Sequence, residues 1–272
     1  MKKFMKRFMK RSLIAALLIA ASFTASAWGR IGHSTVVEIA KRHLTAKAQE
    51  NISKYMSYDI TKDAQWMDKN RSKKSKWPYS NDWHSFYYDS KLRHDPNMKI
   101  RHGDALRALD LATRNLAIYE ELSDSAVIYN LRAVLHIVGD IHCPAHCKLI
   151  GGRDGGKNQG VYLNGAYVRS FHLVYDDMPK YLYGRDKNPA VLAEELDIYS
   201  KGQIKKVCKG NHHDWAQDCI NRTHIIHKWN PNDGTAELRD DTIERSRELI
   251  DAQLRHAGYR LAHLLNQYFD KK

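Results

Sequence analysis

The sequence has 272 residues and a formal net charge of +13 at pH 7, with 44 Lys and Arg against 31 Asp and Glu. Six of the basic residues and none of the acidic ones lie in the first 27 positions, so the charge of the remaining chain falls from +13 to +7. No linker, repeat or low-complexity stretch divides residues 28–272, which favours one domain over several. No apolar run after residue 27 is long enough to cross a membrane, which excludes a membrane span in the mature chain.

The first 27 residues are typical of an export signal rather than of folded structure. An apolar stretch at 13–21, too short for a bilayer, follows a basic head and precedes Ala25-Ser26-Ala27, a signal for cleavage after Ala27. The basic head contains Lys2, Lys3, Lys6, Arg7, Lys10 and Arg11. We therefore expect the mature chain to begin at Trp28 and to be exported, to a periplasm or outside the cell. A monomer is a separate expectation that no motif in the chain specifies.

Apolar residues recur at helical spacing through most of the remaining chain. This periodicity predicts helices over residues 34–43, 45–56, 61–68, 104–122, 126–142, 191–208, 214–229 and 242–269. Within residues 160–168, Asn164-Gly165 separates two short runs of strand-forming residues, which is a strong signal for a hairpin. The predicted fold class is therefore mainly α: a single-domain multi-helix bundle with one small β-hairpin.

Four cysteines in an exported chain permit three disulfide pairings. Cys208 and Cys219 lie in neighbouring helical patterns and are plausible partners. Cys143 and Cys147 flank His146, where either a small disulfide loop or two thiols close to a metal would fit. The sequence leaves these alternatives open.

Residues 135–147 read LHIVGDIHCPAHC and offer three candidate metal ligands. His136 and Asp140 are one turn apart on the same helix face, and Pro144 ends the helix so that His146 approaches from its end. Two imidazoles and a carboxylate suit zinc. Taken alone, a core histidine with ordinary hydrogen-bond partners and a capped helix end explain the stretch equally well.

Two further groups of candidate residues precede this stretch, one at the expected N-terminus and one around Asp68. If Trp28 is the first residue, its α-amine and carbonyl are potential ligands beside His33, although His33 would also serve as a simple helix cap. Asp68 ends a predicted helix, and Arg71 follows it by one turn. An ordinary salt bridge between the two is the alternative to a functional role.

Two more candidates come from an aromatic segment and from a possible helical turn. His84 lies in Trp-His-Ser-Phe-Tyr-Tyr at 83–88, predicted as a short strand in which His84 points opposite its neighbours, unless the segment is simply aromatic core. His172 and Asp176 are one helical turn apart after the hairpin. In isolation, a local hydrogen bond between them is the simpler interpretation.

The ordered set of these motifs is more specific than any one of them. W-G-x-x-G-H, W-x-D, W-H, H-x-x-x-D-x-x-x-x-x-H and H-x-x-x-D follow one another along the chain. The set resembles the zinc-dependent single-strand nucleases of the S1/P1 family, with a phospholipase C/nuclease-like fold, and the resemblance runs from Trp28 to the C-terminus. In that family the mature N-terminal Trp is itself a ligand, and the cleavage signal independently places Trp28 first.

The resemblance implies a cluster of three zinc ions per chain. One zinc would be held by Asp68, His84, His136 and Asp140. A second would be held by the amine and carbonyl of Trp28 with His33 and the shared Asp140. The third would be held by His146, His172 and Asp176.

The implied activity is hydrolysis of phosphodiester bonds in single-stranded DNA or RNA to 5′-phosphate products, with 3′-nucleotidase activity compatible with the same site. Asp68 would also orient the attacking water, and Arg71 would bind the charge that develops on the phosphate. Phe86 or Tyr87 is the candidate platform for base stacking, with a buried aromatic as the competing interpretation. The family commonly has Gln where this chain has Cys143, and often a polar base-contacting residue in place of Tyr87.

Two other functions compete with this hypothesis. A zinc-dependent phospholipase C shares the fold and the N-terminal Trp ligand, but it typically has a longer gap to the first histidine and Glu in place of Asp176. A non-catalytic zinc-binding exported protein would have lost a ligand or Arg71, and neither is lost here. Seven other histidines match no motif and are interpreted as surface or helix-face residues: His142, His212, His213, His224, His227, His256 and His263.

Overall fold

The computed structural model describes residues 28–71, 78–98, 100–150, 160–226 and 237–271. Within these ranges helices predominate and strands are short, which confirms the predicted mainly α fold. The predicted export signal and cleavage position lie outside the described residues, as does the end of the helix predicted over 214–229. No described helix has both the length and the hydropathy needed to cross a bilayer.

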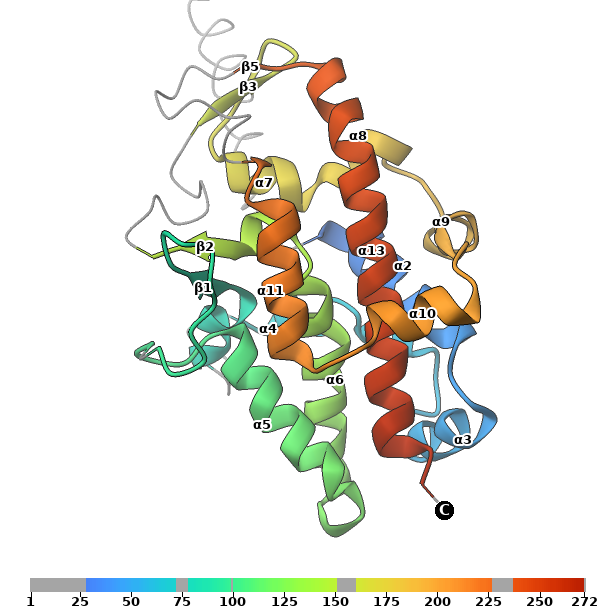
Figure 1. The fold of residues 1–272 in the computed structure, drawn as a ribbon. Coiled ribbons are helices and arrows are strands. Elements are labelled where there is room, and N and C mark those ends of the chain that lie inside the picture. The colour runs from blue at the N-terminus through green and yellow to red at the C-terminus, as the bar shows by residue number, and fades with distance from the viewer. Residues whose placement is uncertain (1–27, 72–77, 99, 151–159, 227–236, 272) are drawn as a thin grey trace, which may run out of the picture.

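The longest described helix is α13 (Asp240–Phe269), which runs alongside most other elements of the bundle (Figure 1). Its Ile250, Leu254, Leu261 and Leu265 repeat at helical spacing and are fully buried. Helix α13 packs against α2 (Gly29–Arg42), α3 (Ala46–Tyr55) and α6 (Asp124–Asp140). Helix α13 therefore forms one side of the core, and both α2 and α6 pack against it.

Helix α6 packs against α5 (Ala105–Ala117) (Figure 1). The C-terminal end of α6 contains His136 and Asp140. Asp104 caps α5, accepting a hydrogen bond from the Arg107 amide at 3.0 Å. The helix predicted over 104–122 ends earlier, because the Ile118 amide bonds to the Asn115 carbonyl and the 3-10 turn η3 (Tyr119–Glu121) follows. Helix α6 ends at Asp140, before Pro144 in the short 3-10 helix η4 (Pro144–His146).

The strands among the described residues form two small sheets. Strand β1 (Phe86–Tyr88) pairs in parallel with β2 (Cys147–Leu149), which directly follows η4. The predicted hairpin is confirmed as β3 (Val161–Leu163) and β4 (Ala166–Val168), with β5 (Glu237–Leu238) added in parallel to β3. Asn164 and Gly165 both have positive φ, 49° and 77°, which is the conformation that a two-residue hairpin turn requires.

The remaining short elements complete the bundle. They are η1 (Ile60–Asp63), α4 (Trp66–Asn70), η2 (Pro78–His84), α7 (Phe171–Asp176), α8 (Met178–Tyr183), α9 (Pro189–Leu196), α10 (Lys201–Val207) and α11 (His212–Thr223). The single helix predicted over 191–208 is wrong, because α9 and α10 are separate. Asp197 follows α9 and bonds to Arg42 and Tyr259, while Ser200 and Gln203 form a capping box that begins α10.

A buried polar network fixes the C-terminal end of α6. The Arg260 guanidinium on α13 donates to His142 Nε2 at 2.8 Å and to Asp218 Oδ2 on α11 at 2.7 Å. His142 Nδ1 in turn donates to the Val138 carbonyl at 2.7 Å. The interpretation of seven histidines as surface or helix-face residues is therefore wrong for His142, which is fully buried and lies beyond the end of α6. His212 and His256 lie on α11 and α13 but are buried, and His227 lies outside the described residues.

None of the four cysteines forms a disulfide, and all four are buried. The pairing of Cys208 with Cys219, which the sequence left as one plausible alternative, is therefore not formed. Burial raises the pKa of the Cys208 and Cys219 thiols to about 11 each, so both are protonated near neutral pH.

Substituting Asp218 by Asn should destabilise the fold, because the buried Arg260 guanidinium would lose its carboxylate partner. Burial opposes ionisation of Asp218, but His256 and Arg260 hold its pKa well below the usual range. Such a group stabilises the fold above its unfolded pKa of about 4, and this stabilisation is lost as the pH falls below that value. At pH 7 we expect a cost of about 2 kcal/mol and a Tm lower by about 4–8 °C.

Thermal melts at pH 7 and pH 3 test this expectation. The deficit of D218N relative to the wild type should shrink at the lower pH. Asp270→Asn, at an exposed position after α13, is the matched control and should melt like the wild type. Equal Tm values for D218N and the wild type at pH 7 would contradict the role given to the pair.

Candidate metal centre

His136 and Asp140 lie at the C-terminal end of α6 and face His84, at the end of η2. Asp140 Oδ2 lies 2.8 Å from His84 Nδ1 and 3.2 Å from His136 Nε2. His136 Nδ1 donates to the Ala64 carbonyl at 2.8 Å, which orients the ring so that Nε2 faces the group. The strand predicted over 83–88 is shorter than expected, because His84 ends the 3-10 helix and only residues 86–88 form β1.

Asp68 and Arg71 approach the same group from α4. Asp68 Oδ1 lies 3.8 Å from both His84 Nδ1 and His136 Nε2. The Arg71 guanidinium is 3.4 Å from that oxygen and is partly exposed. Helix α4 therefore brings a carboxylate into the group and a cation to its edge.

Trp28 and His33, at the start of α2, complete this side of the group. The buried Trp28 indole donates from Nε1 to the Gly139 carbonyl at 2.8 Å. The His33 ring stacks on His136 with centroids 4.1 Å apart, and its Nε2 lies 3.3 Å from Asp140 Oδ1. His33 and His84 thus approach different oxygens of Asp140, and Trp28 anchors α2 beside them.

A second part of the group is formed by His146 in η4 and by His172 and Asp176 on α7. His146 Nε2 and His172 Nε2 each lie 3.4 Å from an oxygen of Asp176, and the two rings stack at 4.7 Å. His146 Nδ1 hydrogen-bonds to the His84 carbonyl and lies 4.0 Å from Asp140 Oδ1. Cys143 remains a thiol, with Sγ 3.8 Å from Asp176 Oδ1. The structure thus brings one of the two flanking cysteines to the group.

The donor atoms of this group fit divalent cations. Several buried polar atoms in it lack a hydrogen-bond partner: both ring nitrogens of His33, His84 Nε2, Asp140 Oδ1, His146 Nε2, His172 Nδ1 and Asp176 Oδ2. An unsatisfied buried polar atom costs about 1–3 kcal/mol, and ordinary cores satisfy nearly all of them. Imidazole nitrogens and carboxylate oxygens are the ligands that zinc prefers. Cation binding would therefore give these atoms the partners that the folded chain does not supply.

Electrostatics within the group also favour a cation. Burial would lower the pKa of His136, but Asp140 and Asp68 raise it to about 9. Burial would raise the pKa of Asp140, but His136 and His84 hold it well below its usual range. At the other end, burial lowers the pKa of His146 and His172 to about 4 each, so both rings are neutral and can offer lone pairs near neutral pH. The carboxyl beside these two neutral rings is Asp176, and burial raises its pKa to about 7. A cation at this end would supply the positive charge that favours its ionised form.

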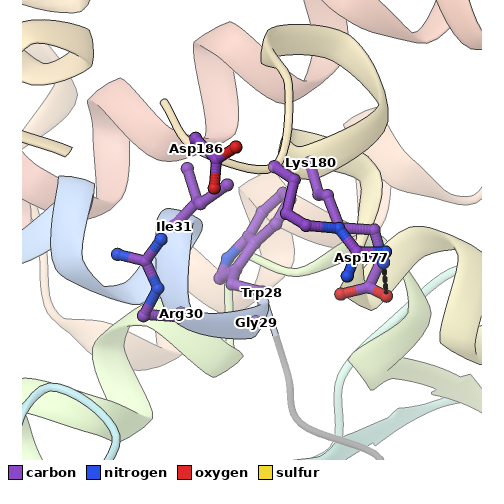
Figure 2. Close-up of a pocket in the computed structure, with 8 residues that line it drawn as sticks. Trp28, Gly29, Arg30, Ile31, Asp177, Lys180 and Asp186 are labelled. Atoms are coloured by element: carbon purple, nitrogen blue, oxygen red, sulfur yellow. Dashed lines mark hydrogen bonds and ion pairs between the residues drawn. The ribbon is translucent and has the colours of Figure 1, made fainter. Parts of the chain in front are cut away.

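A surface pocket lies next to Trp28 (Figure 2). Besides Trp28, its lining residues are Gly29, Arg30, Ile31, Asp177, Lys180, Arg185 and Asp186. Lys180 forms an ion pair with Asp177, which directly follows Asp176, the last residue of α7. The start of α2 therefore lies between the candidate ligands and a hollow at the surface.

The two aromatic candidates for base stacking differ in exposure. Phe86 is fully buried, with its ring nearly perpendicular to that of His94. Tyr87 is half-buried, and the Lys148 ammonium lies 6.0 Å from its ring across the β1–β2 pair. Sequence reasoning missed Lys148, because its position opposite Tyr87 depends on the parallel pairing of β1 with β2, which the local sequence does not predict.

Substituting Gly139 by Ala should displace His33, because the added Cβ would lie 2.7 Å from His33 Nδ1. We expect the variant to bind divalent metal about 10–100-fold more weakly, as measured by metal content after dialysis. The matched control is Gly202→Ala on α10, where an added Cβ meets nothing within 4 Å. Wild-type metal content in G139A would contradict the role of this close approach.

The comparisons with known proteins point to one family. The chain matches the family described as S1/P1 Nuclease over residues 28–270. It is also similar to Endonuclease 4 of Arabidopsis thaliana, with 25% identity over 279 aligned residues that cover 91% of each chain. These matches support a nuclease, a hydrolase that acts on phosphodiester bonds. Because the family match spans nearly all of the described residues and starts at Trp28, the chain belongs to the S1/P1 nuclease family.

Proposed function

We propose that this chain is an exported, zinc-dependent endonuclease that hydrolyses single-stranded DNA or RNA to 5′-phosphate products. The observation that carries the proposal is the buried group in which Asp68, Asp140 and Asp176 meet five imidazoles, many of whose atoms lack hydrogen-bond partners. Such a group is costly to bury without cations. A 3′-nucleotidase activity would use the same site.

The positions of the side chains support a distribution of three zinc ions. Asp68, His84, His136 and Asp140 would hold one ion, and His146, His172 and Asp176 would hold another. The third would be held by His33, Asp140 and the amine and carbonyl of Trp28. The shared role of Asp140 is supported by its geometry, since His33 lies 3.3 Å from Oδ1 while His84 lies 2.8 Å from Oδ2.

The zinc ions, when bound, supply Lewis acidity at the phosphate and lower the pKa of the water that attacks phosphorus. The guanidinium of Arg71 binds a phosphoryl oxygen and stabilises the negative charge that develops there. Asp68 positions Arg71 through their 3.4 Å contact and accepts a hydrogen bond from the attacking water. Lys148 adds a positive charge beside His146 and His172.

The depth of the site favours a single strand over a duplex. His136 and Asp140 are fully buried, and His84 and His172 are 4% and 7% exposed. A stiff duplex would hold its phosphates away from such a recess, whereas a single strand can bend in and stack a base on an aromatic ring. Tyr87 is the better candidate for that ring, because Phe86 has no exposed face.

A protein that begins at Trp28 should contain about three zinc ions per chain and should digest single-stranded DNA and RNA to 5′-mononucleotides. A form with one extra residue before Trp28 should lose one zinc and most activity, because the α-amine would become an amide. Zinc analysis and a chelator-sensitive nuclease assay measure both. Full activity of the extended form would remove Trp28 from the ligand set, and hydrolysis of phosphatidylcholine instead of nucleic acid would favour a phospholipase C.

Substituting Arg71 by Gln should lower kcat by about 100–1000-fold while leaving zinc content unchanged, because Arg71 is proposed to bind the phosphate rather than the metal. Arg71→Lys should recover part of the rate. The matched control is Arg245→Gln on α13, where the arginine side chain is 60% exposed. A wild-type kcat in R71Q would refute the role, and loss of zinc would show that Arg71 acts on the structure of the centre.

A further inference from the structure

A second histidine–aspartate cluster lies outside the candidate centre. Asp110 on α5 faces His212 and His213, the first two residues of α11, and His94 from the loop after β1 stacks on His213. None of these four residues is among the nine candidate ligands described above. Three separate segments of the chain therefore meet in this peripheral cluster of Asp110, His212, His213 and His94.

The distances within this peripheral cluster suit a metal ion. His212 Nε2 and His213 Nε2 lie 2.7 and 3.0 Å from the same oxygen, Asp110 Oδ1. All three donor atoms lie within 4.8 Å of one another. Ligand atoms at zinc–nitrogen and zinc–oxygen distances of about 2 Å are separated by about 3.3 Å in a tetrahedral site. Small adjustments of the side chains would therefore place a divalent cation between them.

The placement of protons gives a second, independent argument. His94 Nδ1 lies 3.1 Å from the Tyr87 carbonyl, which accepts only, so this nitrogen carries the proton in a neutral ring. His94 Nε2 then accepts, and it lies 3.1 Å from His213 Nδ1, which must donate. The remaining nitrogen of a neutral His213, Nε2, therefore directs a lone pair at the Asp110 carboxylate. A cation between these two acceptors removes the conflict.

The hydrogen bonds from His213 to His94 and from His94 to the Tyr87 carbonyl also resemble the environment that protein metal ligands normally have. A metal-binding histidine usually donates its other ring N–H to a carbonyl, a carboxylate or a similar acceptor, which fixes the ring. Here His213 donates to His94, and His94 donates to the Tyr87 carbonyl. The amides at the start of α11 do not oppose a cation, because the Asn211 side chain already accepts hydrogen bonds from the amides of His213 and Asp214.

We propose that Asp110, His212 and His213 form a peripheral binding site for a transition-metal dication of the zinc class, with His94 orienting His213. One carboxylate and two imidazoles leave a coordination position for water, and imidazole selects zinc, copper or nickel over magnesium and calcium. The Asp110 and His213 side chains are 36% and 27% exposed, so an ion can enter from solvent. The bound ion joins α11 to α5 and, through His94, to β1.

Zinc binding to the full mature chain tests this site. The purified protein is first saturated at the buried centre and is then titrated with zinc chloride, with bound zinc measured by equilibrium dialysis. The wild type should bind one more zinc than Asp110→Asn and His213→Gln, or bind the last zinc at least about 10-fold more tightly. His224→Gln, at the residue that follows α11 and outside the cluster, is the matched control and should bind as the wild type does.

Thermal melting and nuclease activity separate this site from the candidate centre. Zinc added beyond saturation of the centre should raise the Tm of the wild type and H224Q but not of D110N or H213Q. Both variants should keep nuclease activity, which shows that they fold and that the buried centre is intact. Equal zinc stoichiometry and equal Tm shifts in all four proteins would overturn the proposal and leave a protonated His213 paired with Asp110.

Discussion

The buried carboxylate of Asp140 is approached by imidazoles from three separate segments of the chain. His33 comes from the first described helix, His84 from the end of η2, and His136 from one turn earlier on α6. An ionised carboxylate without solvent is stable only with compensating positive charge and hydrogen bonds. This requirement explains why α2, α6 and the β1 region must meet at one point, and why the remaining helices surround that point.

Helix α13 contributes no candidate ligand, yet it holds the centre together. The Gln253 side chain donates to the His142 carbonyl at 2.9 Å, and the Arg260 guanidinium donates to the His142 ring. Both contacts fix the chain just after Asp140, where α6 ends. The long helix thus sets the position of Asp140 relative to α2, which packs on the same helix. Geometry at a metal site depends on such supporting contacts as much as on the ligands.

Strand β1 connects the two histidine–aspartate groups. His84 enters the buried centre just before the strand, and His94 follows it and bonds to the Tyr87 carbonyl at 3.1 Å. Tyr87 lies on the same strand, opposite Lys148. The position of this short strand therefore affects both His84 in the buried centre and Tyr87, the proposed substrate contact. A cation in the peripheral cluster would restrain β1 from outside without touching the reacting groups.

The sequence by itself determined the features that depend on local spacing. Helical periodicity placed His136 and Asp140 on one face and His172 and Asp176 on another, and Asn164-Gly165 specified the hairpin turn. Only the tertiary structure decided which distant side chains meet. The contact of Trp28 with Gly139, the burial of His142 against Arg260 and the unpaired state of Cys208 and Cys219 depend on how helices pack. Periodicity states which face of a helix is apolar, but it does not state which partner that face finds or at what depth.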